Sequence, residues 1–130
     1  MCAVDTNLVV RLFAQDDAGK AAAARQAMVA DSVFVPKTVV VEFEWVMRGV
    51  YGETRAMIAS AIETILATAN VEVEDSTAIA QAVNWFKGGM DFADAVHLAS
   101  SSHAEFFLTF DASLRRRASA LGAKPATIAP

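Results

Sequence analysis

Residues 1–11 read MCAVDTNLVVR, and this opening contains the pattern that decides the fold. Residues 2–5 form a short apolar run that ends on an acid, which is typical of a buried strand, and we expect Cys2 to be a small buried hydrophobe. Residues 6–15 follow at once, with apolar side chains at helical spacing. A short strand followed directly by an amphipathic helix is the building block of a parallel α/β fold.

The same alternation runs along the rest of the chain. We predict further strands at 32–36, 71–74, 105–110 and 126–129, the last of them at an edge. We predict further helices at 18–30, 38–50, 53–69, 76–87, 91–103 and 112–121. Strands that alternate with helices pair in parallel and are covered on both faces, so the sequence predicts an α/β/α sandwich of three layers with a central parallel sheet.

Length and composition favour one globular domain over residues 1–130. A hydrophobic content of 55% is too high for a disordered chain. The longest apolar stretch, 57–69, is too short to span a bilayer, and the start of the chain lacks the pattern of a secretory signal. With Cys2 as the single cysteine, we expect no disulfide, no thiolate zinc site and a cytoplasmic location.

The net charge of −4 argues against binding nucleic acid by bulk charge alone, but it is compatible with a nuclease that recruits a cation. Reactive residues of parallel sheets gather at the carboxyl ends of the strands. Four acids lie at or near those ends: Asp5, Glu42, Asp94 and Asp111.

Each acid also has a structural interpretation. Asp5 and Asp111 are suited to cap the helices that follow them, and Asp91 is suited to cap the helix that carries Asp94. Glu42 and Glu44 flank one apolar helix face about equally, so spacing does not choose between them.

Taken together, the acids indicate a metal site. Two carboxylates about 4 Å apart repel by roughly 4 kcal/mol at an effective dielectric of 20, so a cluster of four requires protons or a cation. An all-oxygen set of ligands suits Mg²⁺ or Mn²⁺. The chain has no glycine-rich phosphate loop and no serine or cysteine nucleophile motif that would compete with this interpretation.

Four segments resemble the motifs of PIN-domain proteins of the VapC toxin type, in the family's order and spacing. They are VDTNLVVR (4–11), TVVVEFEWVM (38–47), DFADAVHLA (91–99) and FLTFD (107–111). The resemblance implies a Mg²⁺- or Mn²⁺-dependent endoribonuclease that hydrolyses RNA. It also implies the toxin half of a toxin–antitoxin pair, with a cognate antitoxin protein and a homodimer as its partners.

Carried over to this chain, the resemblance makes Asp5, Glu42, Asp94 and Asp111 the catalytic and metal-binding acids, with Asp5 and Asp94 as the principal pair. It selects Glu42 over Glu44. Thr6, Asn7 and Thr109 match the small polar residues that support the acids, and Asn7 is placed to orient Asp5 or a water.

Two other functions compete with this one. A catalytically silent PIN-fold module that binds RNA or protein is disfavoured because such a module gains nothing from four repelling acids. A phosphoacceptor domain needs an acidic pair at the end of the first strand, but Val4 precedes Asp5.

Residues 115–117, all arginine, are interpreted as a solvated helix face rather than an RNA contact. We expect His97 to be a packing residue, and Trp45 and Trp85 to lie in the core or an interface.

Overall fold

The computed structural model describes residues 1–130. The chain forms two compact units, 1–76 and 77–130, called unit 1 and unit 2 below. Each unit is described by itself, and the single domain expected from the sequence stays a prediction. None of the helices is long and apolar enough to cross a membrane.

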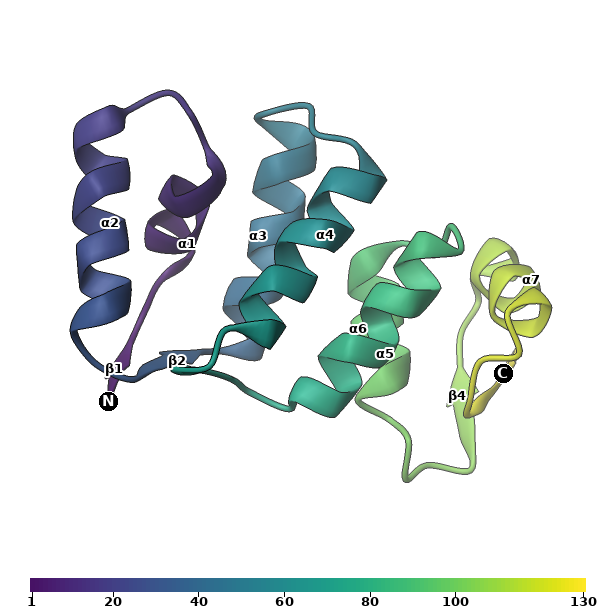
Figure 1. Cartoon of the computed structure of the whole chain (residues 1–130). Helices are drawn as coiled ribbons and strands as arrows, with labels where there is room; N and C mark the ends of the chain where they lie inside the picture. The colour runs from purple at the N-terminus through teal and green to yellow at the C-terminus, as the bar shows by residue number, and fades with distance from the viewer. The chain divides into compact units, whose positions relative to one another are not determined.

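Unit 1 is built from parallel strands joined by helices (Figure 1). Its elements are β1 (Cys2–Ala3), α1 (Thr6–Phe13), α2 (Ala18–Ala30), β2 (Val33–Val35), α3 (Lys37–Gly49), α4 (Arg55–Ala67) and β3 (Val71–Val73). The strands form one sheet in the order β1-β2-β3, with every pairing parallel. Two helices therefore separate each strand from the next along the chain.

The core of unit 1 lies around the central strand β2. Val33 and Val35 of this strand, which pairs with β1 on one side and β3 on the other, are 0% and 1% exposed. The α3 side chain Phe43 is fully buried and meets Phe13 of α1 edge-on, with ring centroids 5.5 Å apart. In Figure 1, α1 and α2 lie side by side, as do α3 and α4.

Unit 2 continues the alternation of strands and helices, and its two strands pair in parallel. Its elements are α5 (Ser76–Lys87), which begins at the unit boundary, α6 (Phe92–Ala99), β4 (Phe106–Leu108), α7 (Ala112–Ala120) and β5 (Ala126–Ile128). Phe86 of α5 and Phe92 of α6 are both buried and meet edge-on, with ring centroids 5.3 Å apart. Helix α7 contacts β5 and buries Leu114 and Ala118.

The α/β class with parallel strands flanked by helices is confirmed. The helix predicted over 91–103 ends earlier, at Ala99, where a run of serines begins and Ser101 donates its hydroxyl proton to the His97 carbonyl. The first strand is also shorter than predicted, because Asp5 already belongs to the helix that follows.

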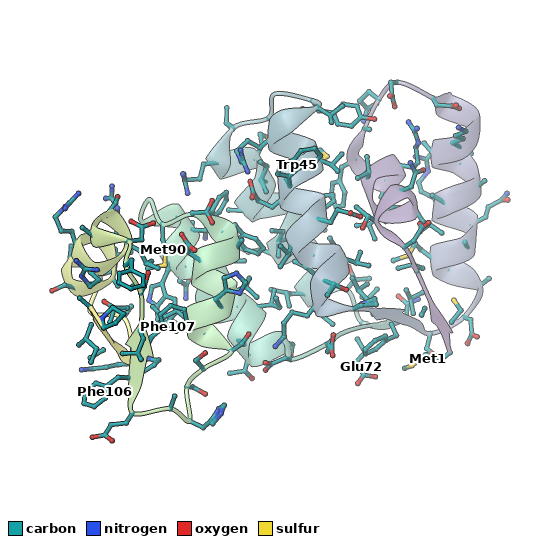
Figure 2. All side chains as sticks on the ribbon, turned by 180° about the vertical axis from the view of Figure 1, so that it is seen from behind. Met1, Trp45, Glu72, Met90, Phe106 and Phe107 are labelled. Carbon is teal, nitrogen blue, oxygen red and sulfur yellow. The ribbon has the colours of Figure 1, made fainter.

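Two predictions about single side chains are wrong, and a third is narrowed. Cys2 is exposed, because strand β1 pairs only with β2 and offers Cys2 little cover. His97 is exposed rather than packed. Trp45 is 57% exposed on α3 (Figure 2), so of its two expected places only an interface stays a prediction, whereas Trp85 is buried as expected.

Candidate metal site

Asp5 is the N-cap of α1, immediately after strand β1. Its backbone is extended, and its Oδ1 accepts a hydrogen bond from the backbone N–H of Leu8 at 2.9 Å. This satisfies one of the free donors at the helix start and fixes the orientation of the carboxylate. The second oxygen, Oδ2, has no partner in the chain. The capping and the metal-binding interpretations of Asp5 are therefore compatible, since each uses a different oxygen.

A pocket of about 400 Å³ opens beside Asp5, entirely within unit 1. We call it the carboxylate pocket. It is lined by residues from the starts of α1 and α3: Asp5, Thr6, Asn7, Thr38, Val39 and Glu42. Because β1 and β2 are parallel neighbours, their carboxyl ends bring the starts of the following helices to one edge of the sheet. The topology thus accounts for the meeting of Asp5 and Glu42.

Glu42 and Glu44 have different surroundings although only one residue separates them. Glu42 is exposed, lines the carboxylate pocket and has no hydrogen-bond partner in the chain. Glu44 is 3% exposed, and its Oε2 accepts a hydrogen bond from Nε of Arg48 at 2.7 Å. Burial and an ion pair therefore occupy Glu44, while Glu42 remains open to a ligand.

Asp94 lies in the first turn of α6, in unit 2. The helix is capped by Asp91, whose Oδ1 accepts from the backbone N–H of Asp94 at 3.0 Å, as expected from the sequence. Desolvation raises the pKa of the half-buried Asp94 carboxyl above its ordinary value, and the charge of Asp91 raises it further. Protonated His97 opposes this effect, and the charge of Asp111 adds to it. Burial and two neighbouring acids therefore disfavour the charged form of Asp94.

Asp111 caps α7, directly after β4. Its Oδ1 accepts from the backbone N–H of Leu114 at 3.0 Å. The Thr109 hydroxyl accepts from the backbone N–H of Asp111 at 3.0 Å, and the Thr109 carbonyl accepts from Nη1 of Arg115 at 2.7 Å. The first of the three arginines is thus engaged in holding the turn that carries Asp111.

The oxygen donors of each unit suit a hard divalent cation. Unit 1 brings Asp5 and Glu42 to one pocket, and unit 2 brings Asp94 within the electrostatic reach of Asp111. Within neither unit do three acidic, histidine or cysteine side chains gather closely enough to hold an ion. Unit 1 therefore has two carboxylates at one pocket, which is about the share of Mg²⁺ coordination that a protein usually provides, and in unit 2 Asp94 and Asp111 are related by charge only.

Of the supporting residues predicted from the sequence, Asn7 and Thr6 line the carboxylate pocket, and Thr109 bonds to the backbone of Asp111. Sequence reasoning missed Thr38, which lines the same pocket. The signal was present, because Thr38 precedes Glu42 by four residues and so shares its helix face.

Comparison with models of protein families finds a match over most of the chain. A family model described as the PIN domain matches residues 2–120, which extends through both units. A comparison with curated proteins finds no match.

Proposed function

We propose that this chain, which belongs to the PIN domain family, is a Mg²⁺- or Mn²⁺-dependent endoribonuclease. PIN-domain proteins are mostly metal-dependent nucleases. The observation that carries the proposal for this chain is the carboxylate pocket. There Asp5 and Glu42 present oxygens that no group of the chain uses, beside the amide of Asn7. Open carboxylates of this kind are arranged for a cation rather than for packing.

We further propose that the pairs of the two units, Asp5 with Glu42 and Asp94 with Asp111, serve one metal site. Asp5, Glu42 and Asp111 lie on or cap helices that follow strands, where parallel α/β folds place their ligands, and Asp94 lies in the first turn of α6, which follows α5. When bound, a divalent ion lowers the pKa of water and stabilises charge on a phosphate. Asp5 and Asp94 are assigned as the main ligands, and Glu42 and Asp111 as acids that complete the charge.

The residues of the chain have separable roles in this mechanism. The Leu8 N–H keeps the Asp5 carboxylate in place, so that its free oxygen does not reorganise during the reaction. Glu42, exposed and unpaired, is assigned to accept a proton from the attacking water. Asn7 offers an amide that can orient Asp5 or that water, and Thr109 holds the turn of Asp111.

The decisive experiment compares Asp5→Asn with Asp17→Asn. Both residues are N-caps whose Oδ1 accepts a backbone N–H at 2.9 Å. Asp5 lines the carboxylate pocket, whereas Asp17 does not. Asparagine caps about as well as aspartate, so both variants keep their helices. With Mn²⁺ and tRNA or mRNA as substrates, we expect Asp5→Asn to lose more than about 100-fold in cleavage rate, which exceeds the usual effect of a residue outside the ligand set.

Asp17→Asn should cleave at the rate of the native chain. Cleavage by Asp5→Asn at the native rate, with contaminating nuclease excluded, would contradict the assignment. RNA binding by the native chain without cleavage in Mg²⁺ or Mn²⁺ would instead indicate a catalytically silent binding module.

The biological role that we propose is that of a toxin held inactive by a cognate antitoxin protein. An acidic pocket is blocked most directly by a cationic side chain or a covering segment, so we expect the antitoxin to protect the carboxylate pocket. Hydrogen exchange of the inhibited complex tests this. An inhibited complex in which Asp5 and Glu42 stay open to solvent and RNA would contradict it.

We also propose that the protein is a homodimer. In unit 1, α3 and α4 contact each other, and each carries an exposed apolar side chain. Trp45 lies on α3 (Figure 2) and Met57 on α4, and their exposed fractions are 57% and 58%. Exposed apolar side chains of this size are common at protein interfaces. Light scattering at micromolar concentration should give the mass of two chains, and a mass of one chain would reject the proposal.

A further inference from the structure

A second pocket adjoins the carboxylate pocket, and its chemistry is different. It has a volume of about 390 Å³ and lies between α1 and α2, within unit 1. Asp5 and Asn7 line both pockets. The remaining wall includes two basic side chains, Arg11 and Lys20, so we call it the cationic pocket. Two alanines of α2 leave room between the helices.

Arg11 is held firmly at the wall of the cationic pocket. Its Nη1 donates to Asp16 at 2.7 Å, and the hydroxyl of Tyr51 donates to the other oxygen of Asp16 at 2.9 Å. Its Nε–H is buried and has no acceptor in the chain. A buried donor without a partner costs free energy, so this guanidinium keeps unused donor capacity although one end is anchored.

Lys20 supplies the charge. Its side chain is exposed, and its ammonium has no acidic partner, since Asp17 bonds to the backbone N–H of Lys20 and not to its side chain. The charge of Arg11 is largely offset by Asp16, whereas that of Lys20 is not. The unpaired ammonium of Lys20 therefore offsets, within the cationic pocket, the repulsion that the shared carboxylate of Asp5 would exert on a phosphate.

We propose that the cationic pocket binds a phosphate of the RNA strand next to the phosphate that is cleaved. The proposal rests on the proposed nuclease function and assigns its substrate contacts: Lys20 as the charge, Arg11 as a fixed donor, and the shared wall of Asp5 and Asn7 as the link between the two phosphates. A single strand that passes from one pocket to the other would gain there the attraction that the chain's overall charge of −4 does not provide.

The test measures binding separately from cleavage. A fluorescent single-stranded RNA is titrated with the native chain, Lys20→Gln and Arg25→Gln in EDTA, at several salt concentrations. Arg25 is the matched control, because it is an exposed cation on the same helix that lines neither pocket. We expect Lys20→Gln to weaken binding by about 5-fold or more and to lower the salt slope by about one, with Arg25→Gln within about 2-fold of native.

Equal binding by Lys20→Gln and Arg25→Gln, or no binding of RNA by the native chain, overturns the proposal. Displacement of the RNA by inorganic phosphate at low millimolar concentration also overturns it, because the pocket would then hold free phosphate rather than a strand. Cleavage in Mn²⁺ is measured in parallel. Cleavage by the native chain with equal RNA binding by Lys20→Gln supports the nuclease function and contradicts the phosphate contact. Weaker RNA binding by Lys20→Gln without any cleavage supports the RNA contact and contradicts the nuclease function.

Discussion

At the scale of single residues, α3 has two glutamates with opposite tasks. Glu44 is buried and forms a hydrogen-bonded ion pair with Arg48 one turn later, whereas Glu42 faces the carboxylate pocket without a partner. A buried carboxylate that loses its cation is costly, while an exposed one contributes little to stability. Glu44 therefore belongs to the fold and Glu42 to the proposed site.

This contrast predicts that the same substitution affects cleavage at one glutamate and stability at the other. Glu42→Gln should reduce RNA cleavage by at least about 10-fold and leave the free energy of unfolding unchanged. Glu44→Gln should lower that free energy by about 1 kcal/mol, because the ion pair with Arg48 becomes a hydrogen bond to a neutral amide oxygen, and leave cleavage near the native rate. Urea denaturation and a cleavage assay measure the two effects. Reduced cleavage in Glu44→Gln alone would reverse the assignment.

The side-chain surroundings on α3 were only partly predictable. Helical spacing places Glu42 and Glu44 at opposite edges of the same apolar face and cannot tell which edge is buried. The Glu44–Arg48 pair, four residues apart, was a readable signal for a structural role. The exposure of Trp45 was not readable, since it depends on which neighbours cover α3.

At the scale of elements, several acids of the chain are helix caps as well. Asp5, Asp17, Asp91 and Asp111 each accept a backbone N–H three residues later. The caps explain why the helix starts were predicted so closely, because the capping signal is local in sequence. The proposed roles of Asp5 and Asp111 require charge in addition, and capping does not.

Substitutions at Asp111 separate these two requirements. Asp111→Asn keeps a capping oxygen for the Leu114 N–H, so its stability should stay close to native. Asp111→Ala removes the cap and should cost about 1 kcal/mol in unfolding free energy. If Asp111 acts through its charge, both variants lose cleavage activity to a similar degree. Native activity in Asp111→Asn would mean that Asp111 serves only as a helix cap.

Asp16 follows α1 and accepts a hydrogen bond from Tyr51, which follows α3. The contribution of this hydrogen bond to the free energy of unfolding should depend on pH. The hydrogen bond from Tyr51 lowers the pKa of Asp16 below its ordinary 3.8, desolvation opposes this, and Arg11 lowers it further. Because the folded pKa is the lower one, Asp16 contributes stability above pH 3.8 and loses that contribution as the pH falls through the folded pKa. The unfolding free energies of native chain and Asp16→Asn should therefore differ most near neutral pH and converge in acid. A constant difference would contradict this.

At the scale of the whole molecule, the order of strands and helices followed from the sequence, because each element is short and ends at a local signal. The parallel pairing also followed, since every strand is separated from the next by at least one helix. The share of the site held by unit 1 rests on β1 and β2 being neighbours in one sheet, an order that the sequence did not specify. Whether Asp94 and Asp111 act together with Asp5 and Glu42 was not readable, because local patterns encode only the surroundings of each acid.

The last prediction tests whether the two acid pairs serve one metal site. If Asp5 and Asp94 serve one metal site, either Asp5→Asn or Asp94→Asn alone should remove tight Mn²⁺ binding from the whole chain, and the double variant should be little worse than each single one. If the pairs acted separately, each single variant would keep one intact pair and its bound ion. Calorimetry or electron paramagnetic resonance of Mn²⁺ gives both the affinity and the number of ions bound. Asp17→Asn serves as the control, because it changes an acidic cap outside the carboxylate pocket and should bind Mn²⁺ as the native chain does. Additive losses in the double variant, with an ion retained in each single one, would mean that the carboxylates of units 1 and 2 do not act on the same phosphate.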